Sequence, residues 1–167
     1  MWLRREGLYV LAALLLLTSG CAGYRLGSDA PSVLPPDRRT LAISSVKNPT
    51  LRFRLEYRLR SLLRDELTNR NMAKWTEPDK AASLMSLVIH RFIVTSAVTD
   101  EEDKTTKYRV EFRLTAQIRD RESHAIFWES GEVVASESFQ TADRGTAEQQ
   151  ALELAVRELA DRMGFAY

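Results

Sequence analysis

The residue that most plainly invites chemistry is Cys21, the single cysteine of this 167-residue chain. It follows two arginines, an unbroken apolar run over 8–17 and three small or polar residues over 18–20. A charged start, an apolar segment and small residues before a cleavage point together form the pattern of a secretory signal. The apolar run is shorter than the ~20 residues that a membrane span needs. We therefore interpret residues 1–20 as a signal peptide.

The position of Cys21, directly behind the small residues, resembles the cysteine of a bacterial lipobox. The resemblance implies a diacylglycerol on the Cys21 thiol, cleavage after Gly20 and acylation of the new amino group. Several acyl chains on one residue give stable anchoring, whereas a single chain binds only marginally. Ala22 stands where an aspartate would resemble an inner-membrane retention signal. We expect a lipid anchor on the periplasmic side of the cell outer membrane; the alternative is an ordinary cleaved signal with a cysteine nearby.

The rest of the chain offers no residue set for catalysis or metal binding. His90 and His124 are isolated in the sequence, and an acylated cysteine cannot act as a ligand, so zinc binding has no support. Neither a G-x-S-x-G elbow, nor a Walker loop, nor a G-x-G-x-x-G fingerprint occurs. We expect a protein that is not an enzyme, with no metal and no cofactor beyond the covalent lipid on Cys21.

The charge balance bears on the partners of the mature chain. Loss of two arginines and one glutamate with the signal peptide turns the formal net charge from +1 to zero. Nucleic-acid binders carry a basic excess, so a neutral chain argues against a nucleic-acid partner.

Hydrophobic patterning predicts one domain over 38–167, preceded by a flexible tether over 21–37 that is rich in Gly, Pro and Ser. Four strands are predicted, over 39–46, 82–99, 108–120 and 125–140. The strand over 82–99 is apolar on both faces, which favours a central position or a bulge. Gly131 suggests a bulge in the last strand.

Two helices are predicted from apolar residues that recur at three- and four-residue steps, over 50–71 and 146–163. The order of the elements is then strand, helix, three strands, helix. Two amphipathic helices can cover one face of a sheet. We therefore predict an α+β, two-layer sandwich in which two helices cover a four-stranded, mostly antiparallel sheet (β-α-β-β-β-α).

A first group of basic residues follows from this topology. Three consecutive antiparallel strands bring the tip over 100–107 and the loop over 141–145 to one end of the sheet. The group comprises Lys104, Lys107, Arg109 and Arg144. Ammonium and guanidinium groups suit phosphate recognition. The alternative is a solvated hairpin, because five acidic residues share the region.

A second group lies along the first predicted helix. It comprises Arg52, Arg54, Arg58, Arg60 and Arg64. These side chains have the chemistry to face anionic sugars or the acidic groups of a partner. The alternative is a solvated helix face with local ion pairs at four-residue spacing, such as Arg52–Glu56 and Glu56–Arg60.

Four segments in order carry a resemblance to a known family. They are C-x-G-Y-x-L at 21–26, TLAI at 40–43, K-N-P-T at 47–50 and the leucine-striped LEYRLRSLLRDEL at 55–67. This order resembles the lipopolysaccharide-assembly lipoprotein family, LptE, and the resemblance covers essentially the whole mature chain.

The resemblance implies a role in the outer membrane. Members of the family sit inside the β-barrel of LptD, plug it, assist its assembly and bind lipopolysaccharide on its way to the cell surface. A polar barrel interior suits a domain with many charged side chains and zero net charge. The resemblance also implies that lipopolysaccharide phosphates are ligands for the basic group Lys104, Lys107, Arg109 and Arg144. The alternative is a membrane-anchored periplasmic ligand-binding or scaffolding lipoprotein of another envelope machine.

Overall fold

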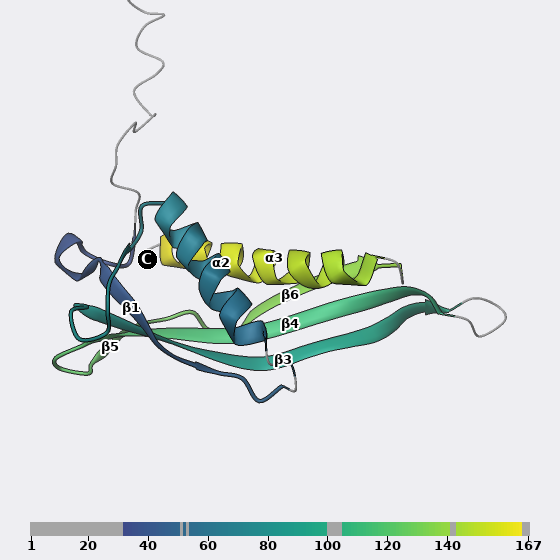
Figure 1. The fold of residues 1–167 in the computed structure, drawn as a ribbon, viewed down its shortest axis with the longest axis horizontal. Helices are drawn as coiled ribbons and strands as arrows, with labels where there is room; N and C mark the ends of the chain where they lie inside the picture. Colours follow the sequence, from purple (N-terminus) through teal and green to yellow (C-terminus); the bar gives the residue numbers. More distant parts are fainter. Residues whose placement is uncertain (1–31, 51, 53, 100–104, 141–142, 165–167) are drawn as a thin grey trace, which may run out of the picture.

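The computed structural model describes residues 32–164 except 51, 53, 100–104 and 141–142. In this part of the chain, a six-stranded sheet carries two helices on one face (Figure 1). The predicted signal peptide, the lipid-attachment residue Cys21 and most of the predicted tether lie outside the described residues. Those assignments, and the division of the chain into one domain, stay predictions.

The sheet is built around one long hairpin. Its strands are β1 (Thr40–Lys47), β2 (Lys74–Trp75), β3 (Ser83–Thr99), β4 (Thr105–Asp120), β5 (Ile126–Glu129) and β6 (Val133–Phe139). The strand order is β2-β1-β3-β4-β5, and β6 pairs with β4 along the same edge as β5. A short 3-10 helix, η2 (Pro36–Arg38), leads into β1. The β3–β4 hairpin extends past the helices (Figure 1).

The α+β class with two helices over one sheet face is confirmed, but the predicted four-stranded, mostly antiparallel sheet is wrong in detail. The sheet is mixed, with six strands, and β1 runs parallel to both β2 and β3. The chain leaves β1 through a helix before it reaches β2 and β3. A crossover of that length returns the chain in its original direction, which gives parallel pairing.

The predicted strand over 125–140 is divided at Ser130 and Gly131 into β5 and β6. Gly131 has φ +64°, a left-handed conformation that glycine adopts without a steric penalty. Arg162 Nη1 donates to the carbonyl oxygens of Ser130 at 2.7 Å and Glu132 at 3.0 Å. The break is therefore tied to the end of the last helix, which explains why one continuous strand does not form.

The first helix, α2, spans Leu55–Asn69, so the prediction of a helix over 50–71 placed its start too early. Asn48 causes the difference. Its Oδ1 accepts from the backbone N–H of Thr50 at 3.1 Å, and its Nδ2 donates to the carbonyl oxygen of Arg52 at 3.1 Å. This side chain satisfies backbone groups in a turn and so delays the helix. Four leucines at four-residue steps form the buried stripe of α2, namely Leu55, Leu59, Leu63 and Leu67.

The second helix, α3 (Arg144–Gly164), packs over β4 and β6 and against α2. Its buried face combines alanines with larger apolar side chains, and the small alanines allow close approach to the sheet. The buried residues are Ala147, Ala151, Leu152, Ala155, Val156, Leu159, Ala160 and Met163. Among the residues that the structure describes, neither helix combines the length and apolar character needed to cross a membrane.

The two faces of β4 differ in chemistry, as the strict alternation of its sequence predicts. Val110, Phe112, Leu114, Ala116 and Ile118 are buried beneath the helices in the main core. The intervening residues, which include Arg109, Glu111 and Arg113, lie on the opposite face of the sheet. We call this second, uncovered side the open face.

β3 is both central and irregular, which confirms the prediction from its apolar residues. It lies between β1 and β4. Its register against β4 shifts between Ile89 and Arg91, so His90 is the extra residue at that point. His90 Nε2 lies 3.0 Å from Thr115 Oγ1, and the side chain is exposed. The shift lets Phe92 point back into the core opposite Phe112.

Candidate anion-binding site

The structure divides the four basic residues predicted at the end of the sheet. Lys107 and Arg109 are exposed, and strand alternation places both on the open face. Arg144 begins α3 on the helix-covered side, where its Nε donates to Glu148 Oε1 at 3.0 Å. Lys104 lies outside the described residues. Lys107 and Arg109 therefore share a surface that Arg144 does not join, and a binding role for any of the four stays a prediction.

The open face carries its own small charge cluster. Arg113 Nε donates to Glu111 Oε1 at 2.8 Å, and Arg91 Nε lies 3.7 Å from the same oxygen. The hydrogen bond from Arg113, followed by the positive charges of Arg113, Arg91 and Arg109, lowers the pKa of Glu111. Three arginines thus surround one carboxylate on this face.

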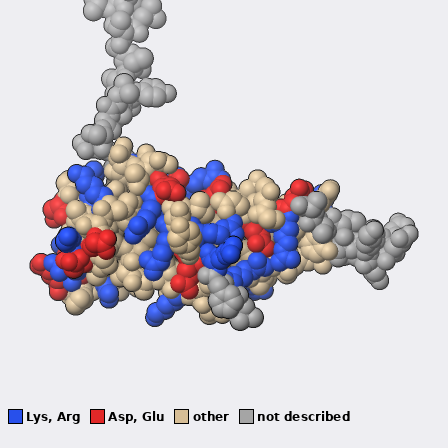
Figure 2. Space-filling view, viewed as in Figure 1, with Lys and Arg blue, Asp and Glu red and all other residues tan. Residues whose placement is uncertain are grey.

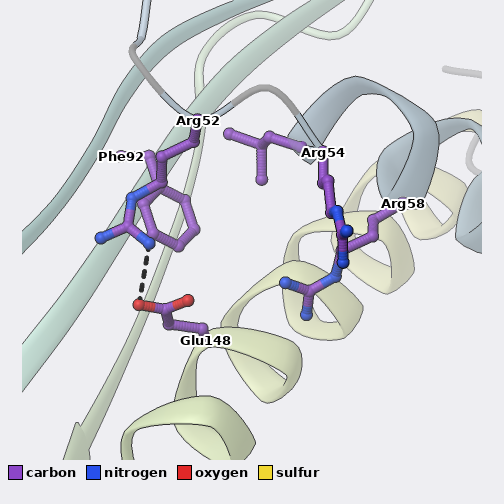
Figure 3. A pocket seen from close by; sticks show the side chains of 6 residues that line it. Arg52, Arg54, Arg58, Phe92 and Glu148 are labelled. Atoms are coloured by element: carbon purple, nitrogen blue, oxygen red, sulfur yellow. Dashed lines mark hydrogen bonds and ion pairs between the residues drawn. The ribbon is translucent and has the colours of Figure 1, made fainter.

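Three of the five arginines predicted on the first helix converge on a cavity of about 330 Å³ (Figure 3). The cavity lies where the start of α2, the start of α3 and β3 meet. Its described lining consists of Arg52, Arg54, Leu55, Arg58, Phe92 and Glu148. Lysine and arginine side chains gather in the middle of the face over which the helices lie (Figure 2). We call this cavity the arginine pocket.

Arg52 is held in the pocket by two contacts with distant segments. Its guanidinium carbon lies 4.5 Å from the centre of the Phe92 ring, a cation–π arrangement. Its Nη1 donates to Glu148 Oε1 at 2.9 Å, and the Glu148 side chain is only 14% exposed. The predicted local pair between Arg52 and Glu56 is absent, because Arg52 precedes the helix and reaches α3 instead.

Arg54 and Arg58 supply the remaining positive charge of the pocket. Arg58 Nη2 donates to the side-chain oxygen of Gln149, which is a neutral partner. Arg54 is exposed and has no ion-pair partner among the described residues. Both side chains extend from the start of α2 toward α3 (Figure 3). Within the part of the chain that the structure describes, neither guanidinium is therefore paired with a carboxylate.

The last two arginines of the group have structural contacts outside the pocket. Arg60 Nη1 donates to the carbonyl oxygen of Ile43 at 3.1 Å, which ties α2 to β1 and replaces the predicted pair with Glu56. The Arg64 guanidinium lies 5.5 Å from the centre of the Trp75 ring. The five arginines therefore do not form one functional surface.

Phe92 and Glu148 belong to the pocket but were not singled out from the sequence. Phe92 lies in an apolar strand, and Glu148 lies in the first turns of an amphipathic helix. Nothing in their local sequence distinguishes them from ordinary strand and helix residues. Within the described ranges, no group of three or more His, Cys, Asp or Glu side chains is placed to hold a metal ion.

A small two-layer α+β domain with an arginine-lined cavity defines a fold class and does not by itself identify one protein. The family model described as LptE, lipopolysaccharide-assembly, matches residues 38–164. The chain belongs to the LptE family, which confirms the resemblance found in its sequence. Comparison with the curated proteins gives no match.

Solved structures share the fold at low sequence identity. Uncharacterized lipoprotein B of Nitrosomonas europaea is 14% identical with a TM-score of 0.58, over 82% of this chain and 87% of that one. A PelC variant dodecamer from Paraburkholderia phytofirmans is 14% identical with a TM-score of 0.53, over 75% and 86%. A minor lipoprotein of Acinetobacter baumannii is 15% identical with a TM-score of 0.52, over 77% and 94%. At such identities the likeness shows the fold alone.

Proposed function

We propose that this protein is an outer-membrane lipoprotein that forms a complex with the LptD β-barrel. It plugs the barrel and assists the assembly and insertion of lipopolysaccharide into the outer leaflet. The observation that carries this proposal is the match of the LptE family model to residues 38–164, which span both helices and the whole sheet.

The surface chemistry of the domain supports a place inside a barrel. Barrel interiors are polar, and the open face presents charged and polar side chains along β4, from Arg109 to Gln117. If the open face lay against the barrel wall, its polar side chains would contact the polar side chains of the barrel interior. In this arrangement the apolar core stays on the other side of the sheet, where α2 and α3 cover it.

We further propose a lipid anchor and a role by binding alone. Lipid on Cys21 would hold the domain at the periplasmic leaflet of the outer membrane. The protein would act by binding, with no enzyme activity, no nucleic acid and no cofactor besides that lipid. Replacement Cys21→Ser would abolish incorporation of labelled palmitate and move the protein out of the membrane fraction. Unchanged palmitate labelling of the variant would contradict the anchor.

The proposed complex is tested by a mild-detergent pull-down of the full-length protein from native membranes, followed by mass spectrometry. We expect a large outer-membrane β-barrel in stoichiometric amount. Recovery of the lipoprotein alone, or with periplasmic partners only, would favour the ligand-binding or scaffolding alternative. As a second readout, depletion of the protein should lower lipopolysaccharide at the cell surface, and a normal surface level would count against the proposal.

A further inference from the structure

We propose that Arg52, Arg54 and Arg58 form a binding site for the phosphate group of a phosphorylated sugar. The inference deepens the proposed function, on which it rests for the identity of that sugar as part of lipopolysaccharide. The site is the arginine pocket. Lys107 and Arg109 of the predicted hairpin-end group lie on the other side of the sheet, whereas Arg144 adjoins the pocket through Glu148.

The charge balance of the pocket favours an anionic ligand. Three guanidinium groups and a single carboxylate line it among the described residues. That carboxylate, Glu148, is already shared between Arg52 and Arg144 through one oxygen atom. Arg54 and Arg58 are four residues apart on one helix side, where like charges repel. A bound anion between them would remove this repulsion.

Arg52 is held in place by three contacts, which favours binding. Phe92 lies under its guanidinium plane, Glu148 bonds one of its terminal nitrogens, and Asn48 holds its carbonyl oxygen. One wall of the pocket is therefore fixed before a ligand arrives. A guanidinium that is already held loses less side-chain freedom on binding, so more of its interaction energy appears as affinity.

The start of α2 adds a third contribution. Arg54 is the residue at the N-terminal cap, and no side chain caps the helix there. The Leu55 N–H donates to the carbonyl oxygen of Arg52 at 3.1 Å, so a ligand could reach only the other first-turn N–H groups. The positive end of the dipole of this 15-residue helix faces the same region. Phosphate oxygens suit both features, because they accept from backbone N–H groups and from guanidinium forks.

The pocket has room for a ligand larger than phosphate itself. Its volume of about 330 Å³ falls at the lower end of the range for small-molecule sites, roughly 300–1,000 Å³. Leu55 and Phe92 supply apolar wall beside the arginines. A sugar ring attached to the phosphate fits this combination of charge and apolar surface.

The test measures binding of glucose 6-phosphate to the full-length protein in a non-ionic detergent, with glucose as the uncharged comparison. We expect glucose 6-phosphate to bind and glucose not to bind. The double variant R54Q/R58Q should weaken binding about a hundredfold or more, because hydrogen bonds to charged groups are worth at least about one power of ten each. Equal binding of the two sugars, or full affinity in the folded double variant, would overturn the site.

Two further variants separate a specific loss of binding from a general effect of charge or a failure to fold. K74Q/K80Q removes two exposed positive charges far from the pocket and should retain full affinity. The single variant R54E reverses an exposed charge that has no ion-pair partner among the described residues, so we expect it to fold normally and to lose binding. An equal loss in K74Q/K80Q would show a general charge effect and contradict the proposal.

Competition experiments identify the source of the phosphate. Glucose 6-phosphate bound to the protein is displaced with purified lipopolysaccharide, with dephosphorylated lipopolysaccharide, with phosphatidylglycerol vesicles and with inorganic phosphate. Displacement by lipopolysaccharide but not by its dephosphorylated form supports the proposal. Displacement only by the vesicles or by inorganic phosphate would overturn the assignment to a phosphorylated sugar.

The outcomes for the pocket and for the proposed function are independent. R54Q/R58Q can lose sugar-phosphate binding and still be recovered with the barrel, which would place the site within an intact complex. Full sugar-phosphate affinity in R54Q/R58Q, with the barrel still recovered, would remove the site and leave the proposed function standing. If the wild-type pull-down contained no barrel, that result would instead contradict the proposed function.

Discussion

Arg52 and Glu148 form an ion pair of 2.9 Å between residues 96 positions apart in the sequence. The same Glu148 oxygen accepts from Arg144 at 3.0 Å. One carboxylate thus joins the turn before α2 to the first turn of α3. Because two guanidinium groups share it, the pair orders the pocket without neutralising it.

Replacement Glu148→Gln tests this relationship. The amide keeps the shape of the side chain but removes the negative charge that opposes an anion in the pocket. We expect the affinity for glucose 6-phosphate to rise several-fold. The free energy of unfolding should fall by only about 0.5–1 kcal/mol, since Arg52 is 35% exposed and ion pairs near the surface contribute little. Titration calorimetry and urea unfolding check the two effects, and a lower affinity would contradict the charge argument.

The open face predicts a dependence of stability on pH. The hydrogen bond from Arg113, and then the surrounding positive charges, hold the pKa of Glu111 below its ordinary value. A carboxylate with a lowered pKa in the folded state stabilises the protein above its unfolded pKa of about 4.3, and this contribution is lost as the pH falls through the folded pKa. Relative to Glu111→Gln, the wild type should therefore be more stable at neutral pH and lose that advantage in acid.

Urea unfolding of both proteins from neutral pH down to about pH 3 measures this difference. Asp120 also has a lowered pKa, from hydrogen bonds with Ser123, but it is present in both proteins and cancels. In an Arg113→Gln background, most of the pH-dependent difference should disappear, because the main donor to Glu111 is gone. A difference that stays constant with pH would show that Glu111 is not stabilised by these charges.

The leucine stripe of α2 predicts a large loss of stability on truncation. Leu59 is completely buried in the main core. Leu59→Ala should lower the free energy of unfolding by about 2–5 kcal/mol, because it removes apolar contacts and leaves a cavity. Ser61→Ala, an exposed change on the same helix, should stay within about 0.5 kcal/mol. Chemical unfolding followed by circular dichroism compares them, and similar effects would contradict the helix orientation.

The hairpin-end residues are tested as two separate groups. Lys107 and Arg109 share the open face, whereas Arg144 is bonded to Glu148 on the other side of the sheet. We expect K107S/R109S to weaken lipopolysaccharide binding, but less than R54Q/R58Q, because both side chains are exposed to competing water and salt. Arg144→Ser should weaken binding through the arginine pocket instead, because Glu148 would then pair with Arg52 alone. Lipopolysaccharide binding measured at two salt concentrations checks these effects. A loss confined to Arg144→Ser would contradict a binding role for Lys107 and Arg109.

The local patterns of the sequence determined much of this protein. The alternation along 108–120 placed the buried residues of β4 on the correct face, from Val110 to Ile118, and the spacing of leucines identified the buried stripe of α2. Such periodicities follow from backbone geometry within a single element, so neighbouring residues are enough to reveal them. The ordered segments between 21 and 67 also carried the family resemblance, which the match over 38–164 confirms.

Only the tertiary structure decided the parallel placement of β1 and the composition of the arginine pocket. Arg52, Phe92 and Glu148 come from a turn, a strand and a helix, and no local pattern links them. Their meeting depends on how α2 crosses the sheet, on the register shift at His90 and on the docking of α3. The same packing turns Arg60 and Arg64 to other partners and leaves Arg54 without a carboxylate among the described residues. The sequence shows which arginines are present, but contacts between distant segments decide which guanidinium groups are paired with carboxylates and which can bind an anion.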